Sequence, residues 1–154
     1  MIDVLKQMDL HFLTLEIFMN KICITYSHHK LGDLIWQLPY IKAISLHHKQ
    51  PIDLVVREKT QAKTLLNDTK YIRNIFYNDF RKGFYYWFDV LNLTKIFLKN
   101  KYTHIYMLDK VNKPAIAAKI SGIKNIIGPG LGRQKNWITS KNYLSQDDWK
   151  LNYS

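Results

Sequence analysis

Short apolar runs rich in β-branched residues alternate with stretches of helical periodicity along most of the chain. The apolar runs, which favour buried strands, lie at 21–26, 52–57, 72–77, 103–108 and 125–127. Apolar residues at helical spacing mark the intervening stretches 34–46, 59–68, 84–98 and 114–121. This alternation predicts an α/β fold, with a parallel sheet, right-handed crossovers and helices on both faces.

Details of three helices can be predicted from their residues. Pro39 lies within the first helical stretch, where an interior proline would cost about 3 kcal/mol. We therefore expect a short turn over 33–37, followed by a main helix that starts near Pro39. In the second stretch, the residues expected to point inward are Ala62, Leu65 and Leu66. The aromatic-rich stretch 84–98 is interpreted as a helix that packs on the core and has a wet edge.

The charge balance points to an anionic partner. The 154 residues include 23 Lys and Arg against 12 Asp and Glu, so the formal net charge is +11. Nucleic acid, an anionic membrane surface or a phosphorylated substrate would suit this charge, and so would a lysine-rich solvated surface without a partner. Cys23 is the only cysteine, which excludes an intrachain disulfide and a Cys-based zinc cage. No run of 18 apolar residues predicts a transmembrane helix.

The first twenty residues differ from the rest. Residues 1–20 carry a net charge of −2, while residues 21–154 carry +13. Apolar residues share one helical face here, at Leu5, Met8, Phe12, Leu15 and Met19. Either this amphipathic helix docks on a partner, or Met19 is the true start; the absence of a basic face disfavours membrane docking. We expect an extension (1–20), a domain (21–140) and an unfinished C-terminal connection (141–154).

Ligands of parallel sheets bind outside the carboxyl ends of the strands, which directs attention to loops 28–33, 57–60, 78–83, 109–113 and 128–135. Gly32 and Asp33 open the first helix directly after the first strand. The glycine permits close backbone approach. Asp33 either caps the helix, which its position alone favours, or acts as a general base facing the cleft.

The glycine-rich loop at 128–132 and the histidine pairs do not match a dinucleotide-binding motif or a metal site. The glycines at 128–132 do not form a dinucleotide fingerprint, because Arg133 replaces its third glycine. Arg133 and Lys135 could contact a phosphate, although composition favours a charged surface loop. The adjacent histidine pairs at 28–29 and 47–48 do not share a helical face and lack a matching carboxylate, so no metal site is expected. With Lys30, the pair at 28–29 is placed as polar contacts at the strand-end cleft.

Nucleic-acid binding is also disfavoured. The aromatic run 85–88, beside Arg81 and Lys82, could stack bases. However, no recognised nucleic-acid-binding motif is present in the sequence.

Several segments resemble glycosyltransferase family 9, the ADP-heptose:lipopolysaccharide heptosyltransferases. The sequence from Lys21 to Thr25 and that from Lys30 through Leu-Gly-Asp-Leu-Ile-Trp-Gln-Leu-Pro to Ile44 look like the opening of that family. Residues 51–56 look like its second strand, and residues 102–109 and 115–128 like its fourth strand, following helix and fifth strand. Over residues 21–140 the resemblance implies the Rossmann-like, acceptor-binding N-terminal half of a GT-B enzyme.

The resemblance also implies a chemistry. Members transfer heptose from ADP-heptose to the Kdo-containing inner core of lipopolysaccharide, and their motif aspartate, thought to be the general base, matches Asp33. The candidate acceptor-binding residues on the strand-end loops are His28, His29, Lys30, Gly32, Asp109, Lys113, Arg133 and Lys135. No metal or cofactor is expected.

The family's second domain, which binds the nucleotide sugar, has no counterpart in the sequence, so we expect a truncated gene product or half of a split protein. Expected partners are the inner-core acceptor, an anionic membrane surface and a separate donor-binding domain or subunit, but no nucleic acid. The expected location is cytoplasmic, with peripheral association at the inner face of the bacterial inner membrane as an option. The alternative functions are a non-catalytic binding module derived from this domain and a basic nucleic-acid-binding domain.

Overall fold

The computed structural model describes residues 1–140, without the side chains of residues 12–19. Its strands are β1 (Ile22–Thr25), β2 (Ile52–Val56), β3 (Ile72–Tyr77), β4 (His104–Met107) and β5 (Asn125–Ile127). Its α-helices are α1 (Ile2–Met19), α2 (Leu31–His48), α3 (Ala62–Leu66), α4 (Tyr86–Asn100) and α5 (Lys113–Ile120). Three 3-10 turns are η1 (Glu58–Thr60), η2 (Gly83–Tyr85) and η3 (Gly132–Asn136). The predicted connection 141–154 lies outside the described residues.

The five strands form one parallel sheet in the order β3-β2-β1-β4-β5. The chain builds outward from β1 to β3, then crosses back to place β4 on the other side of β1. The strand order therefore reverses between β1 and β4, where ligands of such sheets bind. The predicted Rossmann-like α/β class is confirmed.

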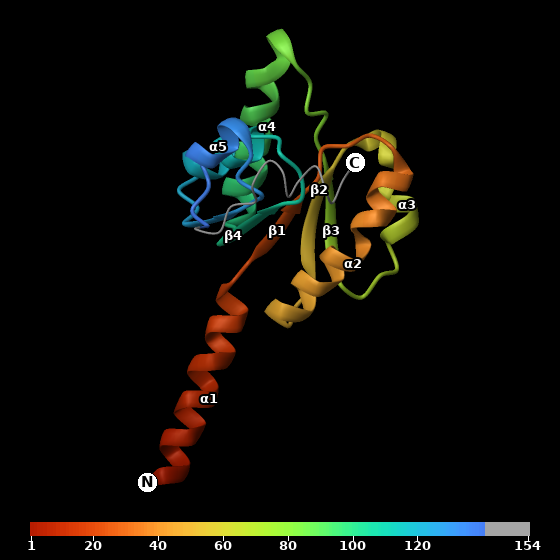
Figure 1. The fold of residues 1–154 in the computed structure, drawn as a ribbon. Helices are drawn as coiled ribbons and strands as arrows, with labels where there is room; N and C mark the ends of the chain where they lie inside the picture. Colours follow the sequence, from red (N-terminus) through yellow and green to blue (C-terminus); the bar gives the residue numbers. More distant parts are fainter. Residues whose placement is uncertain (141–154) are drawn as a thin grey trace.

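Helices cover both faces of the sheet, as predicted (Figure 1). Alternate residues of a strand point to opposite faces, so Ile22 and Ile24 join the core under α2 and α3, while Cys23 joins the core under α4 and α5. Each face thus has its own apolar core, and the sheet holds the strand-end loops at one edge.

The predicted break near Pro39 is wrong, because α2 is one helix with Pro39 inside it. The proline lacks the N–H that would bond to the carbonyl of Ile35. Both residues are exposed, so solvent can reach that carbonyl. Leu34 and Ile41 are buried on the sheet, and their packing offsets the cost of the proline.

The stretch 59–68 is not one helix but is divided between η1 and the five-residue α3. Ala62 and Leu66 are buried, as predicted, because positions four apart lie on one face. Leu65 is half exposed, which corrects its predicted inward position. A helix this short buries one narrow face, and Leu65 lies beside it.

The helix predicted at 84–98 forms and packs on the core through one face. It starts with the 3-10 turn η2, and α4 buries Asp89, Val90, Leu93, Thr94 and Phe97. Its aromatic beginning was expected to pack on the core, yet Phe84, Trp87 and Phe88 are exposed. The apolar spacing is compatible with two helix faces, and the sheet packs against the face that contains Val90 and Leu93.

The helix α1 extends away from the sheet at the end opposite the first turn of α4 (Figure 1). Residues 1–11 are exposed, including the predicted apolar positions Leu5 and Met8. Across the described residues, we find no helix that combines the length and the apolar character required to cross a membrane.

Candidate functional site

A cavity of about 440 Å³ opens at the carboxyl edge of the sheet, where the strand order reverses. One wall comes from the end of β1 and the first turns of α2, and the other from the loop after β4. The lining residues are Tyr26, His28, Asp33, Trp36, Gln37 and Leu108 to Val111. The cavity therefore lies where a parallel sheet of this order binds ligands.

Asp33 presents its carboxylate to this cavity. It is the third residue of α2, and its side chain is 40% exposed. The N-cap is Lys30, which makes no side-chain capping hydrogen bond, so the interpretation of Asp33 as the cap is not supported. Its negative charge at a helix N-terminus is still favourable. The carboxylate is placed to accept a proton from a hydroxyl in the cavity.

The imidazole of His28 lies next to Asp33. Its Nδ1 lies 3.5 Å from Oδ2 of Asp33, and its ring stacks on Tyr26 with centroids 5.0 Å apart and planes within 8°. Because Tyr26 is buried at the end of β1, the stack fixes the imidazole at the mouth of the cavity.

Asp109 joins the ends of β1 and β4. Ser27 donates both its backbone N–H and its hydroxyl to Oδ2 of Asp109, each at 2.6 Å. The backbone N–H of Val111 donates to Oδ1 at 3.2 Å. The carboxylate is buried and occupied by these contacts, so the structure gives this predicted binding residue a positioning role in the cavity wall.

A second cavity of about 550 Å³ adjoins the first, and the two share Lys110 and Val111. Its basic lining residues are Arg57, Lys82, Lys110, Lys113 and Arg133, and none of the described residues that line it is acidic. Such a concentration of one sign of charge favours an anionic ligand.

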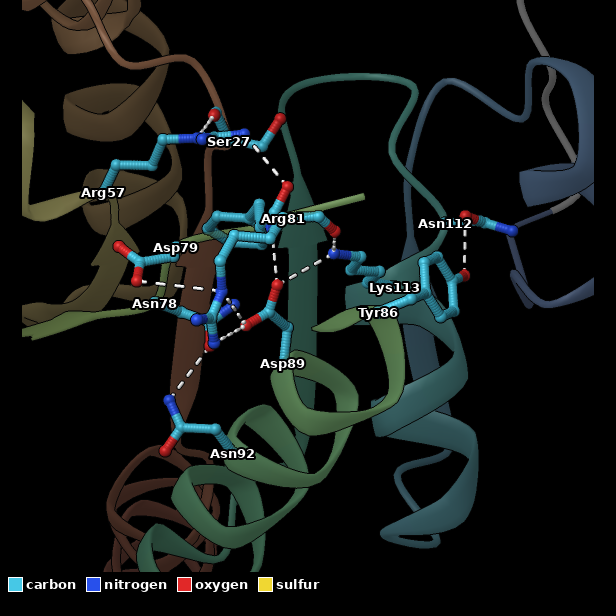
Figure 2. Close-up of polar contacts among 11 residues, drawn as sticks. Ser27, Arg57, Asn78, Asp79, Arg81, Tyr86, Asp89, Asn92, Asn112 and Lys113 are labelled. Atoms are coloured by element: carbon cyan, nitrogen blue, oxygen red, sulfur yellow. Dashed lines mark hydrogen bonds and ion pairs between the residues drawn. The ribbon is translucent and has the colours of Figure 1, made fainter. Parts of the chain in front are cut away.

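Two of these cations make their polar contacts with other groups of the same chain (Figure 2). The Lys113 Nζ lies 3.0 Å from Oδ2 of Asp89 and also donates to the carbonyl of Arg81. Arg57 donates from Nε to the carbonyl of Ser27, and from Nη2 to that of Phe80 at 3.0 Å. The exposed cations Lys82, Lys110 and Arg133 remain as the ones positioned toward a ligand.

The Asp89 carboxylate organises the loop below this cavity. Its Oδ1 lies 2.9 Å from Nη2 of Arg81, whose backbone N–H also donates to Asp89. Burial raises the pKa of Asp89, but the hydrogen bonds from Arg81 and Lys113 outweigh it and hold this pKa below its ordinary value. Asp89 is therefore ionised while buried, which sequence reasoning did not anticipate.

The predicted site residues divide into three groups. The first cavity is lined by His28, Asp33 and Asp109, and the second by Lys113 and Arg133. Four others line neither cavity: His29, Lys30, Gly32 and Lys135.

Sequence reasoning missed two positioning residues. Arg57 directly follows β2 and lies in the loop 57–60 that was predicted to matter, so its position was a usable signal. Gln134 is fully buried, and its amide donates to the carbonyls of Asp109 at 2.9 Å and Val111 at 3.0 Å. Its Oε1 accepts the N–H of Gly130 at 2.9 Å. No signal identified Gln134, because it lies between two basic residues in a loop.

No group of three His, Cys, Asp or Glu side chains in the described part of the chain could hold a metal ion. The prediction that the reaction needs no metal or cofactor is not tested by this observation.

Comparisons with known proteins identify the fold. No protein-family model and no curated protein matches the chain. The chain is similar to the structure of Escherichia coli ADP-heptose lipopolysaccharide heptosyltransferase II, with a TM-score of 0.64 and 15% identity over 82% of this chain and 36% of that one. It is also similar to the crystal structure of a glycosyltransferase family 9 protein from Veillonella parvula, with a TM-score of 0.61 and 19% identity over 79% and 35% of the two chains.

The chain thus spans about a third of the length of these structures. Identities this low show the fold alone. The fold is that of part of a glycosyltransferase family 9 structure, as the sequence resemblance implied.

Proposed function

We propose that this chain is the acceptor-binding domain of a heptosyltransferase-like glycosyltransferase, which moves heptose from ADP-heptose to the lipopolysaccharide inner core. The observation that carries the proposal is the junction of the two cavities. One contains the carboxylate of Asp33 and the other contains Lys82, Lys110 and Arg133. A proton acceptor and an anion-binding surface are thus side by side at the carboxyl edge of the sheet.

In this function Asp33 is the general base. A hydroxyl of the acceptor in the first cavity gives its proton to the Asp33 carboxylate. The hydroxyl oxygen then bonds to the anomeric carbon of heptose, and the bond from that carbon to the ADP phosphate breaks. A positioned base typically contributes about 10²–10⁴-fold to the rate. The Nδ1 of His28 lies beside this carboxylate, 3.5 Å from its Oδ2.

The second cavity would bind the acidic groups of the acceptor. Kdo is an acidic sugar, and its carboxylate would lie against the exposed cations Lys110 and Arg133. Bidentate hydrogen bonds between arginine and a carboxylate add geometric specificity to charge attraction. Arg57 and Lys113 would act indirectly, by ordering the loops that carry these cations.

The donor site would come from elsewhere. Because the chain spans about a third of the structures it resembles, we assign ADP-heptose binding to a separate domain or subunit. The reaction proposed here uses no metal or other cofactor, and its acceptor implies a site at the cytoplasmic face of the bacterial inner membrane.

Acceptor binding can be tested without turnover. Isothermal calorimetry with a deacylated inner-core oligosaccharide should show affinity about tenfold weaker in Arg133→Gln, because a charge-assisted hydrogen bond is lost. Lys135→Gln is the matched control: both residues are exposed in η3, but Lys135 lines neither cavity. Equal affinities of the two variants would contradict the proposed site. Binding without transfer in the presence of a donor-binding domain would favour the non-catalytic alternative, and tighter, salt-sensitive binding of oligonucleotides would favour the nucleic-acid alternative.

A further inference from the structure

The start of α4 exposes a set of large apolar side chains that the proposed catalytic chemistry does not use. Phe84 is 83% exposed, and the other members are each at least half exposed. The set, here called the aromatic ridge, comprises Phe84, Tyr85, Trp87, Phe88 and Leu91. An exposed apolar patch of this kind marks an interaction surface.

The ridge is ordered rather than a loose loop. The rings of Phe84 and Phe88 are 6.1 Å apart, and the guanidinium of Arg81 lies 4.5 Å from the centre of the Tyr85 ring. Asp89, buried in the first turn of α4, binds both the side chain and the backbone of Arg81 (Figure 2). The ridge is thus held in place by the same carboxylate that receives Lys113 from the second cavity.

Charge around the ridge selects the partner. At the ridge itself Arg81 and Lys82 are basic, and the acidic residues are Asp79, which pairs with Arg81, and the buried Asp89. Lys82 lines the second cavity together with the exposed cations Lys110 and Arg133. Basic residues close to a membrane surface are each attracted by anionic lipids, while Trp and Tyr rings favour the level of the lipid headgroups. Aromatic rings at the projecting end of α4 and exposed cations beside it therefore match an anionic bilayer.

The position of the ridge has a consequence for the site. The first turn of α4 projects beyond the rest of the domain at one end, away from α1 (Figure 1). Lys82 and Tyr86 lie on either side of the ridge residues Phe84 and Tyr85 in the sequence, and both line the second cavity. A membrane that contacts the ridge would therefore lie beside the cavity that binds the acidic acceptor.

We propose that the aromatic ridge inserts into the headgroup region of an anionic lipid bilayer and docks the domain with its second cavity next to the membrane. The insertion itself is independent of catalysis, whereas its value for capturing the acceptor rests on the proposed function.

The test measures binding of the full chain to phosphatidylcholine vesicles with and without phosphatidylglycerol. The double variant Phe84→Ser/Trp87→Ser should bind the anionic vesicles about tenfold or more weakly, since membrane binding scales with buried apolar area. Tyr40→Ser/Leu46→Ser is the matched control, because it removes an exposed aromatic and an exposed leucine from α2, and it should bind like the parent chain. Both variants replace exposed residues, and their unfolding curves would establish that each is folded.

Depth is the second readout. Lipids brominated near the headgroup should quench the fluorescence of Trp87, and Trp87→Phe should remove that quenching while retaining vesicle binding. Two results would overturn the proposal: equal vesicle binding by the two double variants, or self-association in the absence of lipid that Phe84→Ser/Trp87→Ser abolishes, which would assign the ridge to a second copy of the chain. Since no transfer reaction is measured, vesicle binding can fail or succeed independently of the proposed function.

Discussion

The Nζ of Lys113 lies 3.0 Å from Oδ2 of Asp89, and both side chains are at most 3% exposed. This ion pair joins the first residue of α5 to the first turn of α4. Arg81 also binds Asp89, so removing Lys113 leaves this buried carboxylate with one cation fewer rather than without compensation.

The first prediction is that Lys113→Met lowers the free energy of unfolding by about 1.5–3 kcal/mol, because Asp89 loses a charge-assisted hydrogen bond. The double variant Lys113→Met/Asp89→Asn should lose more, because the ion pair between Arg81 and Asp89 is then lost as well. Urea unfolding measures both. The control is Lys119→Met, at an exposed position of the same helix, and a Lys113→Met curve that matches it would mean that the pair contributes nothing.

The second prediction concerns Asp33. The chain alone should show no heptose transfer, because donor and acceptor must both be positioned before a base can act. With a cognate donor-binding domain supplied, Asp33→Asn should reduce the rate at least about a hundredfold. Its free energy of unfolding should fall by about 1 kcal/mol or less, the typical value of a charge at a helix N-terminus.

The control for this substitution is Asp68→Asn, which replaces another exposed aspartate outside both cavities. It should retain the full rate. Transfer by the chain alone would remove the need for a donor domain, and an undiminished rate in Asp33→Asn would leave this residue with a helix-stabilising role.

The third prediction concerns α1. A chain that starts at Met19 should unfold cooperatively at a nearly unchanged denaturant midpoint, because residues 1–11 are exposed and β1 begins at Ile22. Circular dichroism at increasing urea concentration measures this. A large drop in the midpoint would show that α1 contributes to the core.

The fourth prediction is a loss of stability on mild acidification. Burial, and then the positive charge of His104 and His47, lower the pKa of His48 from 6.5 to about 4. Between these two pH values the unfolded chain binds a proton at His48 that the folded chain does not. The free energy of unfolding should therefore fall as the pH decreases from about 6.5 to about 4. The contribution of His48 to this free energy should not change with pH above about 6.5.

The neutral ring of His48 can accept the hydroxyl of Tyr106, whose oxygen lies 2.8 Å from Nε2. In His48→Gln, the dependence of the unfolding midpoint on pH over this range should be reduced. The pKa of His104 is also lowered by burial, so some dependence should remain. His29→Gln, in an exposed loop, is the control, and an identical pH profile in both variants would exclude His48 as the source.

The central strands β1 and β2 could be predicted from the sequence because they bury apolar residues on both faces of the sheet. Even β2 was found, although its Asp53 is fully buried. The Arg73 Nε lies 2.9 Å from one oxygen of Asp53, and the Tyr102 hydroxyl donates to the other at 2.6 Å. The partners are 20 and 49 residues away, so periodicity could not reveal that this carboxylate is satisfied inside the core.

The site was predicted less completely, because the partners of its charged residues are also distant in the sequence. Asp33 comes directly after the loop that follows the first strand, so its place at the carboxyl edge of a parallel sheet could be predicted. Lys113 was expected to face a ligand, but its partner Asp89 lies 24 residues earlier in the sequence. Whether a charged residue faces solvent or a buried counter-ion depends on tertiary contacts, and sequence spacing alone does not contain them.

The contacts of Gln134 determine when the cavity wall can form during protein synthesis. The wall shared by the two cavities is tied to Gln134, whose amide holds the carbonyls of Asp109 and Val111. The ribosome releases residues in sequence order, so β1 is exposed long before its neighbour β4, and Gln134 emerges later still. A nascent chain that stops short of residue 134 would carry all five strands but an unfastened cavity wall. The wall shared by the two cavities is therefore fastened only after all five strands have been synthesised.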